Sequence, residues 1–138
     1  MSLAVLENRK QKSKPSPDQT TLELMHVPVE PFDTPALDGV SVTLGGLGLI
    51  QVGRDKHSQQ IASTWMTGVS GQVIRNKLRR VLEASLENLA HKKSASEIKT
   101  HWAGFGQLLE TESHRELSRL GMEFIGFLPG APVISPTA

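Results

Sequence analysis

The side chains best suited to specific contacts are basic or amide-bearing and lie in the second half of the chain. Six of them are candidates for binding a nucleic acid or an acidic protein partner: Arg75, Asn76, Arg79, Arg80, Lys92 and Lys93. Guanidinium and ammonium groups bind phosphates and carboxylates, and an Asn amide can also bond to a base edge. Apolar residues at helical spacing accompany them, so we expect one amphipathic helix over residues 71–90.

Residues 59–82 resemble, in part, a helix-turn-helix DNA reader. In that motif small residues in the turn let two helices cross closely, and the second helix lies in the major groove. Here a helix, the link Gly68-Val69-Ser70 and a basic second helix follow one another. Two departures are visible: Ala62 lies six residues before the turn glycine instead of four, and the second helix is unusually long. A nucleic-acid-binding regulator that uses the helix 71–90 is therefore our alternative hypothesis.

The remaining reactive side chains do not form a catalytic or metal-binding pattern. The chain has no Cys, which excludes disulfides, thiolate ligands and Cys nucleophiles. Its five histidines are scattered over the sequence, at His26, His57, His91, His101 and His114. Glu23 and His26 would point to opposite faces of an extended segment. We therefore predict no metal site.

The small residues likewise indicate structure and not chemistry. The run Gly45-Gly46-Leu47-Gly48 lacks the third glycine and the Gly-Lys-Ser/Thr of phosphate loops, and it indicates a hairpin turn. Ser70 lacks the flanking glycines of a hydrolase nucleophile elbow and suits a helix N-cap. We predict that the protein is not an enzyme and holds no cofactor.

Charge is segregated along the chain although the formal net charge is only +1. Residues 9–14 are basic, and between residues 15 and 53 every charged side chain is acidic: Asp18, Glu23, Glu30, Asp33 and Asp38. The balance is basic again over residues 72–93. Complementary blocks in one chain favour contacts between subunits, and such contacts between identical subunits form rings or tubes.

Proline divides the chain into an arm, a body and a tail. Five of the eight prolines lie at or before Pro35 and three at or after Pro129. Because proline interrupts helices and inner strands, we expect an extended arm over 1–36, a single folded body over 37–128 and a tail over 129–138. The arm alternates weakly, and Pro28 restricts it to a sheet edge. Its candidate subunit-contact residues are Leu22, Leu24, Met25, Val27 and Val29.

We expect the body to form a small β-hairpin followed by helices. Two β-rich runs around Gly45-Gly46 predict a hairpin over 40–52. Residues 58–128 show helical spacing throughout, with capping boxes at Ser94 to Glu97 and Ser113 to Glu116. The second box predicts a last helix that extends to Leu128, so the helices would form an antiparallel bundle of three to four.

The sequence thus predicts an α+β fold with an extended N-terminal arm, a hairpin and a helical bundle. No apolar run is long enough to span a bilayer, and we expect no membrane partner and a cytoplasmic location, or a particle assembled in the cytoplasm. The expected role is a non-catalytic structural or adaptor subunit of a larger assembly, such as a viral particle or a nucleoprotein complex. Its partners would be other protein subunits in a homo- or hetero-oligomer, and the arm would make subunit contacts.

Overall fold

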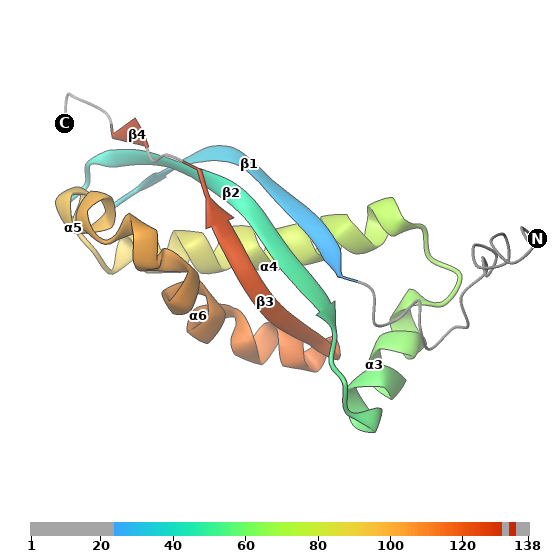
Figure 1. Cartoon of the computed structure of the whole chain (residues 1–138). Helices are drawn as coiled ribbons and strands as arrows, with labels where there is room; N and C mark the ends of the chain where they lie inside the picture. Colours follow the sequence, from blue (N-terminus) through green and yellow to red (C-terminus); the bar gives the residue numbers. More distant parts are fainter. Residues whose placement is uncertain (1–23, 131–132, 135–138) are drawn as a thin grey trace, which may run out of the picture.

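The computed structural model describes residues 24–130 and 133–134. Within these residues, three long strands and four α-helices make an α+β fold (Figure 1). In chain order the elements are β1 (Met25–Pro35), β2 (Ser41–Val52), α3 (Lys56–Met66), α4 (Gly71–His91), α5 (Ala95–Thr100), the 3-10 turn η1 (Trp102–Gly104), α6 (Phe105–Arg119), β3 (Met122–Pro129) and β4 (Val133–Ile134).

One antiparallel sheet organises the chain. Strand β2 lies in its centre, with β1 along one side and β3 along the other. The two-residue strand β4 pairs with the start of β2, at Val42 and Thr43. Both outer strands carry a register shift, between Val29 and Phe32 in β1 and opposite Leu49 and Ile50 in β3. Because bulges increase twist, the sheet curls along its length.

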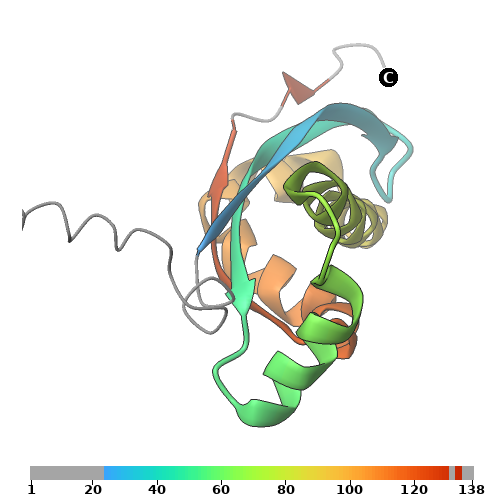
Figure 2. The ribbon, with the colours of Figure 1, turned by 90° about the vertical axis from the view of Figure 1, so that its right-hand side faces the viewer.

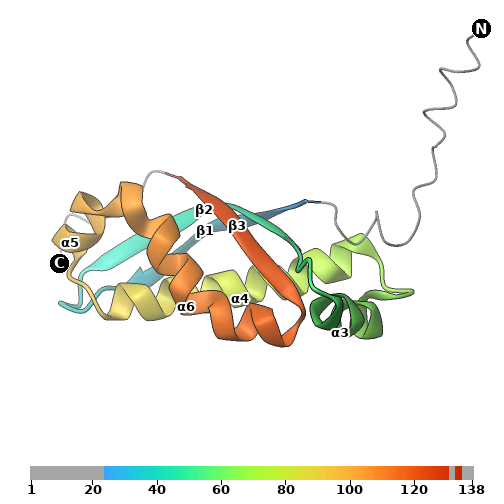
Figure 3. The same cartoon turned by 60° about the horizontal axis from the view of Figure 1, so that its bottom comes forward.

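Helices α4 and α6 cover one face of this sheet. Helix α4 packs against β1, α6 packs against β3, and the two helices also contact each other. Figure 2 shows the sheet end-on, curved around the two helices, and Figure 3 shows both helices in front of it. Helix α5 links them at one end of the molecule, whereas α3 lies at the opposite end, after β2 (Figure 1).

The core lies between the sheet and the two helices. Alternate residues of β2 point into the core, and the apolar stripe of α4 faces them. The large apolar side chains that these two elements bury fully are Val42, Leu44, Ile50, Val52, Leu78, Leu82 and Leu86. Full burial of one such side chain is worth about 1.5–3 kcal/mol. The predicted helix over 71–90 is confirmed, and Ser70 caps it by accepting a hydrogen bond from the Val73 amide. The Ser94–Glu97 capping box is confirmed as well.

The predicted hairpin over 40–52 is wrong, because residues 41–52 form the single strand β2. The glycines that indicated a turn instead let other groups approach the sheet. A Cβ at Gly48 would overlap the Leu82 side chain of α4, and one at Gly46 would lie 2.6 Å from the Phe127 ring. The sequence signal for a turn was therefore a signal for close packing.

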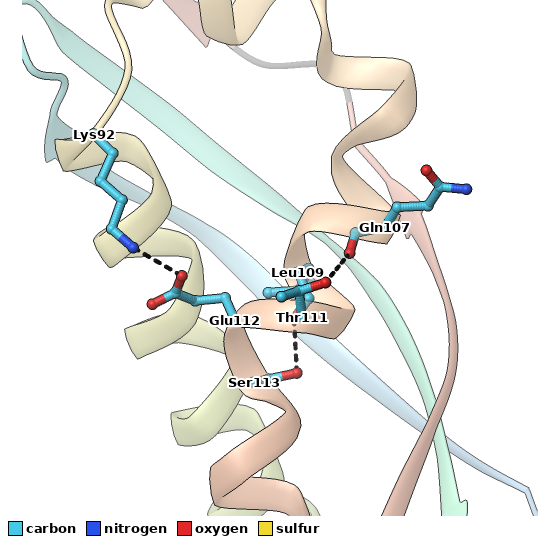
Figure 4. A network of polar contacts seen from close by, with 6 residues as sticks. All are labelled: Lys92, Gln107, Leu109, Thr111, Glu112 and Ser113. Carbon is cyan, nitrogen blue, oxygen red and sulfur yellow. Dashed lines mark hydrogen bonds and ion pairs between the residues drawn. The ribbon is translucent and has the colours of Figure 1, made fainter.

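The predicted helical bundle is also wrong. Helix α6 ends at Arg119, Gly121 follows with φ +72°, and residues 122–129 form β3 where a fourth helix was expected. Ser113, the expected cap of that helix, is instead buried in the middle of α6 and donates to the Leu109 carbonyl at 2.8 Å (Figure 4). Pairing with β2, which is distant in sequence, decides the conformation after Gly121.

The expectation of an extended arm over 1–36 is corrected for its last part. Residues 25–35 form strand β1, which pairs along its length with β2 of the same chain. Pro28, Pro31 and Pro35 are accommodated because β1 is an edge strand, where a missing N–H group is tolerated. The rest of the predicted arm, residues 1–23, lies outside the described residues.

Candidate interaction surfaces

The six candidate contact residues of the sequence lie in three separate places. Arg75, Asn76 and Arg79 lie on the flank of α4 next to β1, where they line a hollow of about 260 Å³ with Pro28 and Glu30. All three are already engaged within α4: the Asn76 amide oxygen accepts a hydrogen bond from Gln72 Nε2 at 3.2 Å. Arg79 forms an ion pair with Glu83 at 3.3 Å, and Arg75 donates to the Gly71 carbonyl at 3.4 Å.

The other three candidates do not join this group. Arg80 lies on the opposite flank of α4, beside α6. Lys92 forms an ion pair with Glu112 at 3.0 Å (Figure 4), and the Lys93 carbonyl accepts a hydrogen bond from the Leu37 amide at 2.8 Å. At about 1.5 Å of rise per residue, Arg75 and Lys92 are roughly 25 Å apart along the helix. The six residues therefore do not form one continuous face.

A groove runs between α4 and α6 on the side away from the sheet. Its volume is about 900 Å³, and its charged lining residues are Lys77, Arg80, Glu112, Arg115, Glu116 and Arg119. We call it the basic groove. Arg119 pairs with Glu116 at 3.3 Å, whereas no carboxylate of the described chain lies within 4.0 Å of Lys77, Arg80 or Arg115. Sequence reasoning missed Arg115 and Arg119, because only the packing of α6 against α4 brings them beside Arg80.

A second hollow, of about 390 Å³, lies on the other flank of α6. Its charged residues come from four elements or their ends: Arg54, Asp55, Glu110 and Glu123, with His114 among them. We call it the acidic hollow. Asp55 accepts hydrogen bonds from the Ser58 hydroxyl at 2.7 Å and the Ser58 amide at 2.9 Å. These bonds stabilise the carboxylate, so they lower the pKa of Asp55.

The acidic hollow includes a serine next to a histidine, but not the arrangement of a catalytic triad. The Ser118 hydroxyl lies 3.4 Å from Nε2 of His114, and both residues are exposed on consecutive turns of α6. Within residues 24–130, no hydrogen bond joins His114 to a carboxylate that could orient its ring. In the same part of the chain, no three His, Asp or Glu side chains converge as metal ligands.

The candidate subunit-contact residues are distributed over core and surface. Leu22 lies outside the described residues. Leu24 is exposed and Met25 half-buried, whereas Val27 and Val29 are buried in the core between β1 and α4. The side chains of the two valines therefore contribute to the fold of their own chain.

An apolar surface that the sequence did not indicate lies on the sheet face opposite the helices. Pro28, Leu47 and Leu128 are direct cross-strand partners and form one row across all three strands. Leu49 continues the surface in the next row, and Leu128 is 58% exposed. We call this surface the open face; among the described helices, none lies on that side of the sheet in Figure 2. The sequence did not predict the open face, because the predicted turn at Gly45-Gly46 would have separated Leu47 from Pro28.

The fold and these surfaces define a small α+β chain in which the described helices cover only one face of the sheet. Among its described helices, none combines the length and the apolar character needed to cross a bilayer. A comparison with known protein families found no matching family model, and one with curated proteins found no significant match.

Proposed function

We propose that the protein is a non-catalytic structural or adaptor subunit of a multi-subunit assembly, and that the open face is a subunit interface. The observation that carries the proposal is the row Pro28, Leu47 and Leu128. An antiparallel sheet face that meets water normally carries polar side chains at alternate positions. Here two leucines and a proline occupy the row; Pro28 and Leu128 are exposed and Leu47 is half-buried. Contiguous apolar surface that meets water marks interaction sites.

Burial of the open face against another subunit would remove its leucines from water. Each Å² of apolar surface buried in this way stabilises the complex by about 25 cal/mol before the entropic cost of association. A compact apolar centre within a more polar rim is typical of subunit interfaces. His26 and Gln51 provide such a rim, because their strand positions flank the leucines on the same face.

The experiment is a measurement of native mass by sedimentation velocity on the full chain and on two variants. Leu47→Ser with Leu128→Ser should remove the open-face contact and lower the native mass. The circular dichroism spectrum should be preserved, because both side chains lie outside the core. Val73→Ser is the matched control: Val73 is 56% exposed, close to the 58% of Leu128, but lies on α4. A monomeric wild-type chain, or a face variant that associates like the wild type, would contradict the proposal.

The contribution of the N-terminal arm stays a prediction for residues 1–23. Deletion of these residues should weaken association and leave every described strand and helix in place. Unchanged association would exclude the arm from the interface, and it would leave the open face as the contact surface.

The nucleic-acid alternative has less support from the geometry. Its residues are divided among three places, and Arg79 and Lys92 already pair with carboxylates. If it holds, Arg75→Ala with Arg79→Ala should weaken DNA or RNA binding and reduce its salt dependence. The absence of binding by the intact protein at about 50 mM salt would exclude this alternative, since low salt favours phosphate contacts.

A further inference from the structure

The basic groove and the acidic hollow lie on opposite flanks of helix α6. Residues 112, 115, 116 and 119 face the groove, whereas residues 110, 114 and 118 face the hollow. With 3.6 residues per turn, these two sets are separated by the buried stripe of Leu109, Ser113 and Leu117. No ion pair of the described chain joins the two sites.

The two sites carry opposite and equal excess charge. Four cations and two carboxylates line the groove, so its formal excess is two positive charges. Three carboxylates and one guanidinium line the hollow, so with His114 neutral its formal excess is two negative charges. Glu110 and Glu123 of the hollow have no ion-pair partner within the described chain. The same holds for Lys77, Arg80 and Arg115 of the groove.

We propose that the acidic hollow of one copy docks onto the basic groove of the next copy. This inference rests on the proposed function, and it adds the identity of one partner and the type of contact. Two different patches of the same chain would meet, which makes the contact heterologous, so that it propagates into a ring or a filament. Opposite charge would fix the register of the contact and steer association.

The lining of the groove favours a protein partner over a nucleic acid. Glu112 pairs with Lys92 and Glu116 with Arg119, so the groove presents cations interrupted by ion pairs and not the continuous row of free cations that a phosphate backbone would follow. A protein surface of mixed charge can match this alternation. The hollow is such a surface, because Arg54 lies among its carboxylates. Val81, Ala84 and Leu120 give the groove an apolar component that protein side chains can cover.

A charge-swap experiment on the full-length chain tests the contact. In the first variant the groove is reversed by Lys77→Glu, Arg80→Glu and Arg115→Glu; in the second the hollow is reversed by Glu110→Lys and Glu123→Lys. All five positions are exposed, so we expect both variants to fold. Each variant alone brings like charges together and should lose the ring or filament that the wild type forms at the same concentration, and keep only the smaller species joined through the open face.

An equimolar mixture of the two variants should restore the assembly. The reversed groove then meets the reversed hollow, and the unchanged hollow of the first variant meets the unchanged groove of the second. Lys99→Glu and Glu87→Lys are the control reversals, because both residues are exposed and lie outside the two sites. These controls should assemble like the wild type. Raising the salt concentration should weaken wild-type assembly, since exposed charges are screened over about 10 Å at 0.1 M.

The outcomes separate this inference from the proposed function. Variants that assemble alone like the wild type, or a mixture that stays dissociated, would overturn the groove–hollow contact while the wild type still assembles. A wild-type chain that stays monomeric at every concentration would overturn the proposed function and this contact with it. Circular dichroism and thermal unfolding of each variant exclude misfolding as the cause of lost assembly.

Discussion

The indole Nε1 of Trp65 donates a hydrogen bond to the carbonyl oxygen of Leu120, 2.8 Å away. Leu120 is the C-cap of α6, so this bond connects α3 to the turn that precedes β3. A second hydrogen bond holds the same turn: the Gly53 amide donates to the Gly121 carbonyl at 2.9 Å. The end of β2, helix α3 and the start of β3 are therefore joined at one point.

Trp65→Phe should lower the free energy of unfolding by about 1 kcal/mol, the net value of one hydrogen bond in a protein. Phenylalanine preserves most of the ring packing and removes the donor. Urea unfolding followed by circular dichroism measures the change. Trp102 would remain as the only tryptophan of the variant and would report unfolding by fluorescence. An unchanged midpoint would mean that water replaces the indole at the Leu120 carbonyl.

Gly121→Ala should be among the most destabilising single substitutions outside the core. Gly121 has φ +72°, and an added Cβ would overlap the carbonyl oxygen of Ser58, which is backbone and cannot rotate away. We expect a loss above about 2 kcal/mol, since left-handed strain costs about 1–2 kcal/mol and a forced clash adds to it.

Gly39→Ala is the control for the clash at Gly121. Gly39 has φ +84°, but no atom lies within 4 Å of its added Cβ. This variant should therefore show the backbone strain alone, about 1–2 kcal/mol. Equal losses for the two variants in urea unfolding would show that the contact with Ser58 contributes nothing.

Two regions of the chain show how far the sequence predicts this fold. The helix at 71–91 and its Ser70 cap were predictable, because apolar spacing and a capping serine are local signals that agree with each other. Residues 117–128 were not. Leu117, Leu120, Phe124 and Leu128 fit a helical period, yet Gly121 ends the helix and pairing with β2 makes a strand. The spacing of apolar residues within this segment does not indicate that it pairs with a strand distant in sequence.

The candidate surfaces depend on non-local pairing even more strongly. The basic groove needs α6 beside α4, and the open face needs Leu47 opposite Leu128, which lies 81 residues later. The sequence identified Arg80 as a contact residue but could not associate it with Arg115. It also assigned Gly45 and Gly46 to a turn, because a glycine that permits close packing and one that permits a positive φ look the same in sequence.

The close packing at Gly48 predicts strong coupling with Leu82. Gly48→Ala should cost about 1–3 kcal/mol, because the new Cβ overlaps the Leu82 side chain. Leu82→Ala alone should cost about 2–5 kcal/mol through the cavity it leaves. In the double variant the two alanines relieve the overlap and part of the cavity, so the combined loss should be smaller than the sum by about 1 kcal/mol or more.

Gly126→Ala is the control for Gly48→Ala on the opposite face of the sheet. Its added Cβ meets only the Leu49 side chain, at an ordinary contact distance of 3.8 Å. Because glycine within a strand is less favourable than alanine by about 0.5–1 kcal/mol, this variant should be neutral or slightly more stable. Additive losses for Gly48→Ala and Leu82→Ala in a double-mutant cycle would contradict the close approach of α4 to β2.

Because of Asp55, we expect the stability of the N-terminus of α3 to depend on pH. Hydrogen bonds from the Ser58 hydroxyl and amide lower the pKa of Asp55 in the folded chain relative to the unfolded chain. A carboxyl group with a lowered folded pKa stabilises the fold above its unfolded pKa, about 3.9 for Asp. That stabilisation is lost as the pH falls from there through the folded pKa. Acidification should therefore weaken the N-terminus of α3.

Asp55→Asn separates the cap from its charge. Asparagine is about as good an N-cap as aspartate, but it does not titrate. The wild type should exceed Asp55→Asn in stability at about pH 6, and this advantage should shrink as the pH falls below about 3.9. Urea unfolding of both proteins at several pH values measures the difference, and the Ser58 amide shift in NMR locates the titration. A difference that stays constant with pH would mean that the Asp55 carboxylate gains nothing from Ser58.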